Sequence, residues 1–197
     1  MVVHPGFSSQ EQPALDQALA LLAAQLEQIR KRVPAKPLAA LLKVTIWVSP
    51  PYPSVPARAE YHPGASWLRE NGRDPAMAKG VELTNVAIFA QETRRMPLFV
   101  LHELAHAYHD QVLTYADPRI LDAYDKAKKG GKYEKVLRQD ATGRRSLASA
   151  YALTNAQEYF AEGTEAYFGA NDFYPFNRAE LKTHDPILFA LLGEIWR

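Results

Sequence analysis

The segment His102-Glu103-Leu104-Ala105-His106 constrains this chain more than any other, because it places two histidines four residues apart inside an apolar run. The apolar spacing around it predicts a helix over residues 97–113. Residues four apart on a helix share a face, so the two imidazoles can bind one Zn²⁺. Glu103 stands beside them, where it can take a proton from a zinc-activated water. The segment therefore predicts half of a catalytic zinc site.

Composition excludes several other classes of protein. The 47% hydrophobic and 23% charged residues of this 197-residue chain are typical of a globular domain with a real core. A net charge of +1 predicts no broad attraction to nucleic acid or anionic membranes. No apolar run reaches the roughly 18 residues of a membrane span. The absence of cysteine excludes disulfides, thiolate zinc ligands and a cysteine nucleophile.

Apolar periodicity and turn residues predict the order of secondary structure. The predicted helices cover residues 13–32, 97–113, 117–129, 154–168 and 187–196, and the predicted strands cover 43–48 and 81–89. The proline-rich stretch 50–56 indicates a stiff surface connection rather than a polyproline ligand. Residues 61–80 are expected to form a loop with one helical turn at 66–70.

The predicted helices outnumber the predicted strands, and the strands cluster in the first half of the chain. Residues 133–149 fit either a short hairpin or an irregular loop. This distribution favours an α+β fold. We expect one domain over residues 1–197, with an N-terminal lobe of about 1–115 and a helical C-terminal lobe of about 116–197.

A catalytic zinc usually takes three protein ligands, so a third ligand must lie elsewhere. The metzincin pattern would place it six residues after His106, but Val112 stands there, and His109 occupies the position of the expected glycine. A predicted later helix offers carboxylates instead. Its three glutamates share one helical face, namely Glu158, Glu162 and Glu165.

Spacing favours Glu158 as the direct ligand and Glu162 as an acceptor for the free N–H of a ligand histidine. The alternative is purely structural. Thr154 and Gln157 have the spacing of a capping box, and acidic residues near a helix start favour the helix dipole. That alternative accounts for Glu158 in part, but not for Glu162 and Glu165 further along the helix.

Two sequence blocks together resemble a known family. They are His102-Glu103-x-x-His106 and Tyr151-x-x-x-Asn155-x-x-Glu158-Tyr159-Phe160-Ala161-Glu162. In residue types, order and separation they are similar to the catalytic domain of anthrax lethal factor-like zinc metallopeptidases, which are gluzincins. The run from Tyr167 to Phe176 is similar to an uncharacterised bacterial branch with many secreted members. The resemblance is confined to these segments.

The resemblance implies a zincin-like fold, in which a small N-terminal sheet and an active-site helix precede a mostly helical C-terminal part. It also implies one catalytic Zn²⁺ and hydrolysis of peptide bonds. The implied roles are zinc ligation by His102, His106 and Glu158, general base catalysis by Glu103, donation to the oxyanion by Tyr151, and support of a ligand histidine by Glu162. His109 departs from the family pattern, and we expect it to contact substrate or solvent rather than zinc.

The implied partner is a peptide or protein substrate, and a monomer is favoured. Alternatively, the chain is a zinc-binding protein of gluzincin fold that acts as a binding or toxin-like module without general protease activity. A metal-free helical binding protein is a third possibility. The first residues, Met1 to Gly6, do not form a signal peptide. A secreted or periplasmic location is expected if a leader was removed, and a cytoplasmic one otherwise.

Overall fold

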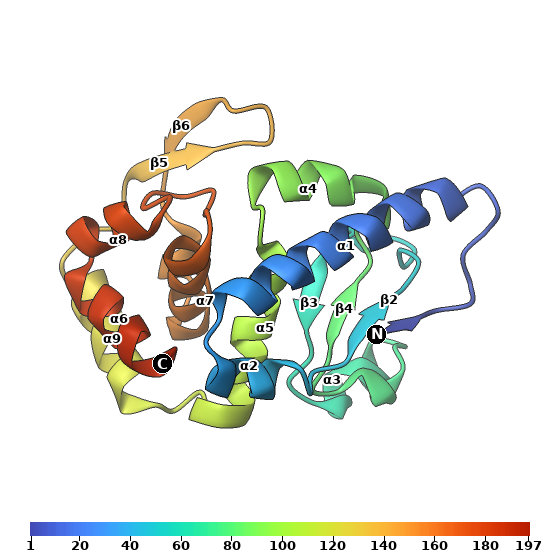
Figure 1. Cartoon of the computed structure of the whole chain (residues 1–197), viewed down its shortest axis with the longest axis horizontal. Coiled ribbons are helices and arrows are strands. Elements are labelled where there is room, and N and C mark those ends of the chain that lie inside the picture. The colour runs from blue at the N-terminus through green and yellow to red at the C-terminus, as the bar shows by residue number, and fades with distance from the viewer.

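The computed structural model describes residues 1–197, with a small mixed sheet in the first half of the chain and packed helices in the second (Figure 1). The helices are α1 (Gln12–Arg32), α2 (Ala35–Leu41), α3 (Ala65–Glu70), α4 (Phe89–Arg95), α5 (Phe99–Tyr108), α6 (Pro118–Lys129), α7 (Ala156–Phe168), α8 (Arg178–His184) and α9 (Pro186–Ile195). Single helical turns are η1 (Pro75–Met77), η2 (Val86–Ile88), η3 (His109–Leu113) and η4 (Tyr151–Leu153). The expected combination of helices with a small N-terminal sheet is confirmed.

The main sheet has the order β1-β2-β4-β3, from β1 (Val2–Val3), β2 (Ile46–Val48), β4 (Val81–Leu83) and β3 (Ala59–Tyr61). The first three strands are parallel to one another, and β3 pairs antiparallel with β4 as the edge strand. Helix α1 crosses the sheet (Figure 1). The edge strand β3 packs against α5, so one edge of the sheet lies beside the helix that carries the two histidines.

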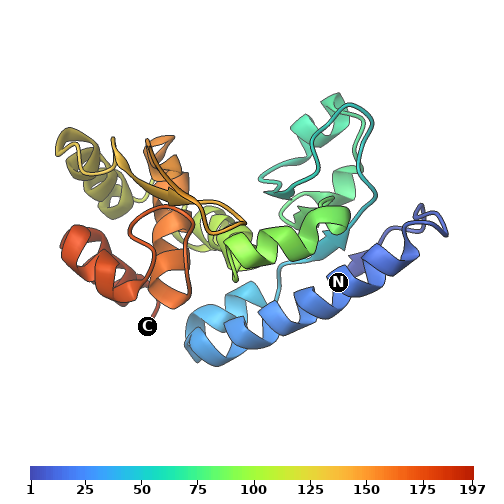
Figure 2. The same ribbon diagram turned by 90° about the horizontal axis from the view of Figure 1, so that it is seen from above.

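Helix α5 lies between the two halves of the molecule, since it packs against β3 on one side and against α7 on the other. Seen from above, the segments around β3 and the C-terminal helices stand apart on two sides (Figure 2). One continuous apolar core joins both halves. None of the helices is both long and apolar enough to cross a bilayer.

A buried glutamine joins α1 to the beginning of α5. The Gln25 side chain is 3% exposed, donates to Thr93 Oγ1 at 3.0 Å, and accepts from the backbone N–H of Val100 at 3.3 Å. The first N–H groups of a helix have no partner within the helix. Gln25 therefore satisfies one of them and holds the start of α5 in place.

Several predicted boundaries differ from the structure for local reasons. The strand expected over 81–89 ends at Leu83, because Asn85 turns the chain into η2 and α4. The helix expected over 97–113 is α-helical only from Phe99 to Tyr108 and then widens into a π-turn, η3. Residues 133–149 contain a hairpin of β5 (Val136–Gln139) and β6 (Arg145–Ala148). Strands β1 and β3 and helices α2, α4 and α8 were not predicted from the sequence.

Candidate metal centre

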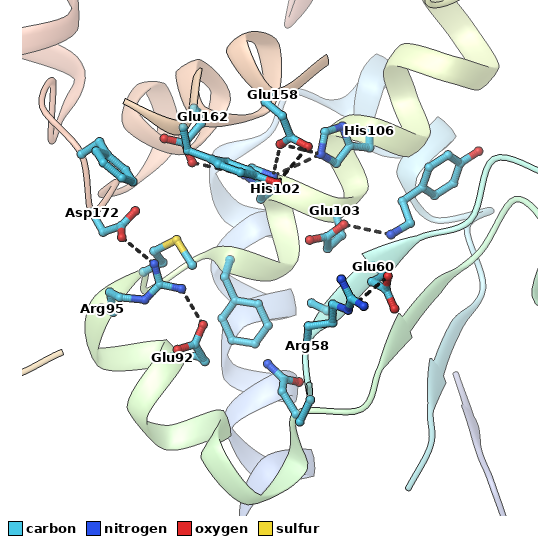
Figure 3. Close-up of a pocket in the computed structure, with 18 of the residues that line it drawn as sticks. Arg58, Glu60, Glu92, Arg95, His102, Glu103, His106, Glu158, Glu162 and Asp172 are labelled. Atoms are coloured by element: carbon cyan, nitrogen blue, oxygen red, sulfur yellow. Dashed lines mark hydrogen bonds and ion pairs between the residues drawn. The ribbon is translucent and has the colours of Figure 1, made fainter. Parts of the chain in front are cut away.

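Helices α5 and α7 bring three potential metal ligands together. Glu158 Oε2 lies 3.0 Å from His102 Nε2 and 3.2 Å from His106 Nε2, and the two imidazole nitrogens are 3.1 Å apart (Figure 3). Both histidine residues are 8% exposed. The expected ligand set thus meets at one point, although its two parts are separated by more than fifty residues of sequence.

The start of α7 places Glu158 in this cluster. Asn155 precedes the helix with extended backbone, and its Oδ1 accepts from the backbone N–H of Glu158 at 2.8 Å. Asn155 is therefore the N-cap, and the capping box considered for Thr154 and Gln157 does not form. This cap sets the first turn of α7, from which Glu158 faces α5.

The donor set fits a zinc ion. Bonds of about 2.0–2.2 Å in a tetrahedral site place neighbouring ligand atoms about 3.3–3.6 Å apart. The three observed separations of 3.0, 3.1 and 3.2 Å are only slightly shorter. Two imidazoles and one carboxylate also match the ligand types of catalytic zinc sites. His102, His106 and Glu158 would hold the ion, and no fourth protein ligand belongs to this group.

The outer nitrogen of His102 contacts a carboxylate, but the closer one is not Glu162. His102 Nδ1 lies 2.9 Å from Glu165 Oε2 and 3.8 Å from Glu162 Oε1. Glu162 instead accepts a hydrogen bond from Asn171 Nδ2 at 3.0 Å. With Nδ1–H donated to Glu165, the Nε2 lone pair of His102 points at the centre of the cluster. Sequence spacing favoured Glu162 for this contact, whereas the structure places Glu165, on the same helical face, closer to His102.

Glu165→Gln is expected to weaken zinc affinity by about 10- to 100-fold, because it removes the negative charge that orients His102 and raises its basicity. Glu162→Gln is the matched control one helical turn earlier, and a smaller loss is expected there. Competition for zinc against a chromophoric chelator measures both affinities. A larger loss in Glu162→Gln than in Glu165→Gln would reverse the assignment.

The electrostatics of the cluster favour positive charge at its centre. Burial raises the pKa of Glu158, but hydrogen bonds from His102 and His106 outweigh this effect and hold that pKa well below its usual range. Burial lowers the pKa of His102, yet hydrogen bonds to Glu158 and Glu165 raise it well above the ordinary value. A metal cation would supply the charge that protons otherwise provide here.

Glu103 lies next to this cluster without belonging to it. Its Oε2 accepts a hydrogen bond from the backbone N–H of Tyr61 on β3 at 2.9 Å. The Tyr61 hydroxyl in turn donates to Asp110 Oδ2 at 2.6 Å, in the π-turn after α5. These contacts fasten the edge strand to the histidine helix at two points. Neither the strand nor the contact to Glu103 was predicted, because β3 forms through pairing with the distant strand β4 and lies in no β-rich run of the sequence.

Tyr151 lies at the mouth of the site in η4. Its side chain is largely accessible, with the residue 48% exposed, and its hydroxyl is 3.4 Å from Glu158 Oε1. Burial of part of the ring, followed by the charge of Glu158, raises the pKa of Tyr151. The hydroxyl therefore keeps its proton at neutral pH and can donate it in a hydrogen bond.

A cleft of about 540 Å³ opens in front of these residues. The edge strand forms one side, α4 and α5 form the floor, and residues from β5, η4 and α7 form the other side. The cleft also contains charged residues that were not predicted from the sequence, namely Arg58, Glu60, Glu92, Arg95, Arg138 and Asp172. Figure 3 shows Arg95 between Glu92 and Asp172, and Arg58 beside Glu60.

The expectation for His109 was wrong. The residue is 0% exposed, and its ring packs near Tyr115 and Phe160, so it contacts neither solvent nor the cleft. Neither ring nitrogen has a hydrogen-bond partner. It follows α5 with helical backbone as the first residue of η3, and it faces Phe160 of α7 in the core rather than the cleft. His109 is a core residue.

Comparison of the chain with protein-family models, curated proteins and solved structures finds no match.

Proposed function

We propose that this protein is a zinc-dependent metallopeptidase of the gluzincin class, similar in its site to anthrax lethal factor-like enzymes. The observation that carries the proposal is the meeting of His102 Nε2, His106 Nε2 and Glu158 Oε2 within 3.2 Å of one another at the edge of an open cleft. Glu103, a carboxylate outside this ligand set, lines the same cleft. A purely structural zinc site has no use for such a residue and usually takes four protein ligands.

In the proposed reaction, zinc would supply a Lewis acid and lower the pKa of water at the site. Glu103 takes a proton from the attacking water and passes it to the leaving amine. The hydrogen bond from the Tyr61 N–H holds one carboxylate oxygen of Glu103 and leaves the other free for this transfer. The Tyr151 hydroxyl donates a hydrogen bond to the oxyanion that develops on the scissile carbonyl.

The edge strand supports a peptide as the substrate. Arg58 and His62 form backbone hydrogen bonds with the β4 side, through Thr84 N–H to Arg58 O and His62 N–H to Gly80 O. Alternate residues of an antiparallel strand point their backbone groups to opposite sides, so those of Ala59 and Tyr61 point away from β4. The contact from Tyr61 N–H to Glu103 agrees with this direction. An extended peptide could add to β3 at Ala59, within the cleft.

The decisive test combines metal content with hydrolysis. Protein freed of metal by a chelator is reloaded with zinc, assayed for bound zinc, and incubated with a degenerate peptide pool whose products are identified by mass spectrometry. One zinc per chain and zinc-dependent cleavage are expected. Stoichiometric zinc without cleavage would favour the alternative, a binding or toxin-like module. Absence of zinc binding would overturn the proposed metal site.

A further inference from the structure

Three arginines line the cleft, and they differ in how many of their guanidinium nitrogens have a partner in the protein. Both Nη groups of Arg95 have partners, because Nη1 contacts Asp172 and Nη2 donates to Glu92 at 2.6 Å. Arg138 donates only through Nε, to Asp172 Oδ2 at 3.3 Å. Arg58 is paired only through Nε, which lies 3.3 Å from Glu60 Oε1. Neither Nη group of Arg58 or Arg138 has a hydrogen-bond partner in the protein.

Both arginines are held in position rather than free in solvent. The guanidinium of Arg138 lies over the ring of Phe173, with Cζ 4.9 Å from the ring centroid, while Asp172 holds its Nε. The Asp172 side chain is 1% exposed and is anchored by Arg95 as well. The Arg138 side chain is nevertheless 45% exposed. Its two Nη groups are therefore presented to the cleft in a restricted orientation.

Arg58, on the other side of the cleft, is held by an ion pair alone. Arg58 immediately precedes the edge strand, and its partner Glu60 accepts from Arg73 Nη1 at 2.7 Å. The Arg73 side chain is only 3% exposed, so the chain of contacts from Arg58 ends in the interior. The Arg58 side chain is 49% exposed. Each side of the cleft thus contributes one half-exposed guanidinium whose Nε contacts a carboxylate and whose Nη groups have no partner.

Arg58 and Arg138 differ from the carboxylates of the cleft, because both of their Nη groups are without any partner in the protein. Every carboxylate that lines the cleft already has a hydrogen-bond or ion-pair partner in the protein. The free Nη groups of Arg58 and Arg138 are donors in the planar geometry that matches a carboxylate, and a pre-oriented guanidinium loses less entropy on binding.

We infer that Arg58 and Arg138 form a pair of carboxylate-binding subsites in this cleft, and that the peptides it takes carry acidic groups. The inference rests on the proposed function, because it names the substrate class of that site. Arg58 immediately precedes the strand on which an extended peptide would pair, and Arg138 lies across the cleft on β5. The carboxylates can be Asp or Glu side chains, or the peptide C-terminus.

Binding tests the inference separately from catalysis. Zinc-loaded Glu103→Gln protein is titrated by fluorescence anisotropy with a labelled decapeptide containing several Glu residues and with its Gln twin, each with a free or an amidated C-terminus. The Glu peptide is expected to bind about 10- to 100-fold more tightly. Equal binding of the Glu and Gln peptides, with weaker binding of both amidated forms, would assign the subsites to the C-terminal carboxylate. Equal binding of all four peptides would overturn the inference.

Because bound zinc also attracts carboxylates, the arginine variants are compared at equal zinc content. Arg138→Gln and Arg58→Gln are each expected to reduce the preference for Glu over Gln by about tenfold, with little change for the Gln peptide. The control is Arg144→Gln in the turn of the same hairpin, where the side chain is 84% exposed and bonds to Asp140 outside the cleft. An unchanged preference in both cleft variants would overturn the inference.

A charge reversal and a cleavage assay complete the test. Arg138→Glu is expected to favour a Lys-containing peptide over the Glu peptide at that subsite, an inversion that simple loss of packing would not produce. If the protein prefers acidic peptides but the wild type cleaves none, the proposed peptidase function is wrong and the carboxylate-binding subsites are confirmed. If the protein cleaves peptides without preferring acidic residues at any position, the carboxylate-binding subsites are wrong and the proposed peptidase function is confirmed.

Discussion

Replacing Glu103 by glutamine is expected to leave zinc binding intact and to lower the rate of peptide hydrolysis by about 10²–10⁴-fold, the usual contribution of general acid–base catalysis. Glutamine keeps an oxygen that can accept from the Tyr61 N–H, which lies 2.9 Å from Glu103 Oε2, but it cannot take a proton from water. Zinc content and kcat, measured on the same preparation, check this result. A fully active Glu103→Gln protein would remove the proposed mechanism.

Tyr151→Phe is compared with Glu103→Gln in the same measurements of zinc content and kcat. It removes one hydroxyl donor 3.4 Å from Glu158 Oε1 while keeping the ring, and it is expected to lower kcat by about 10²–10³-fold with full zinc content. Equal losses of zinc and of activity would show that Tyr151 supports the ligand Glu158 rather than the oxyanion. The two variants together separate proton transfer from oxyanion stabilisation.

The stability of the metal-free protein is expected to fall between pH 6.5 and pH 4 because of His109. Burial, followed by the nearby His106, lowers the pKa of His109 from 6.5 to about 4. Below pH 6.5 the unfolded chain binds a proton that the folded protein does not, so the free energy of unfolding decreases as the pH falls. The decrease from this residue is about 2 kcal/mol by pH 5 and about 3 kcal/mol below pH 4.

His109→Leu isolates this contribution. Leucine is similar in volume and removes two ring nitrogens that have no partner, so the variant is expected to be more stable at pH 7 by about 1–3 kcal/mol. The difference from wild type is expected to widen as the pH falls to 5. Urea denaturation of both proteins at the two pH values, with chelator present, measures it. A gap that is unchanged with pH would contradict the lowered pKa.

The part of the site that local geometry governs was predictable from the sequence. Helical periodicity alone places His102 and His106 on one face, and it also puts the three glutamates of α7 on one face. Glu165 rather than Glu162 contacts His102 because of how α7 crosses α5, and that crossing depends on packing across the whole core. Residue spacing within one helix carries no such information.

The remaining features depend on contacts between distant segments. Strand β3 lacks the β-rich run that predicted β2 and β4, and it exists through its pairing with β4. His109 is buried because its ring packs against Tyr115 and against Phe160 of α7, and helical spacing in α5 does not show which side chains cover it. The guanidinium groups of Arg58 and Arg138 line one cleft, although they are eighty residues apart in the sequence, only because the chain folds the segments around β3 and β5 onto opposite sides of that cleft.

By itself the sequence determined the helix with its two histidines and Glu103, the candidate ligand Glu158, and a mixed fold with a small N-terminal sheet. These are consequences of short-range periodicity, which acts over one or two turns of helix. Only the tertiary structure decided which carboxylate supports His102, where the edge strand lies, and which side chains face the cleft. Those outcomes depend on long-range packing and pairing, which join residues that are far apart along the chain.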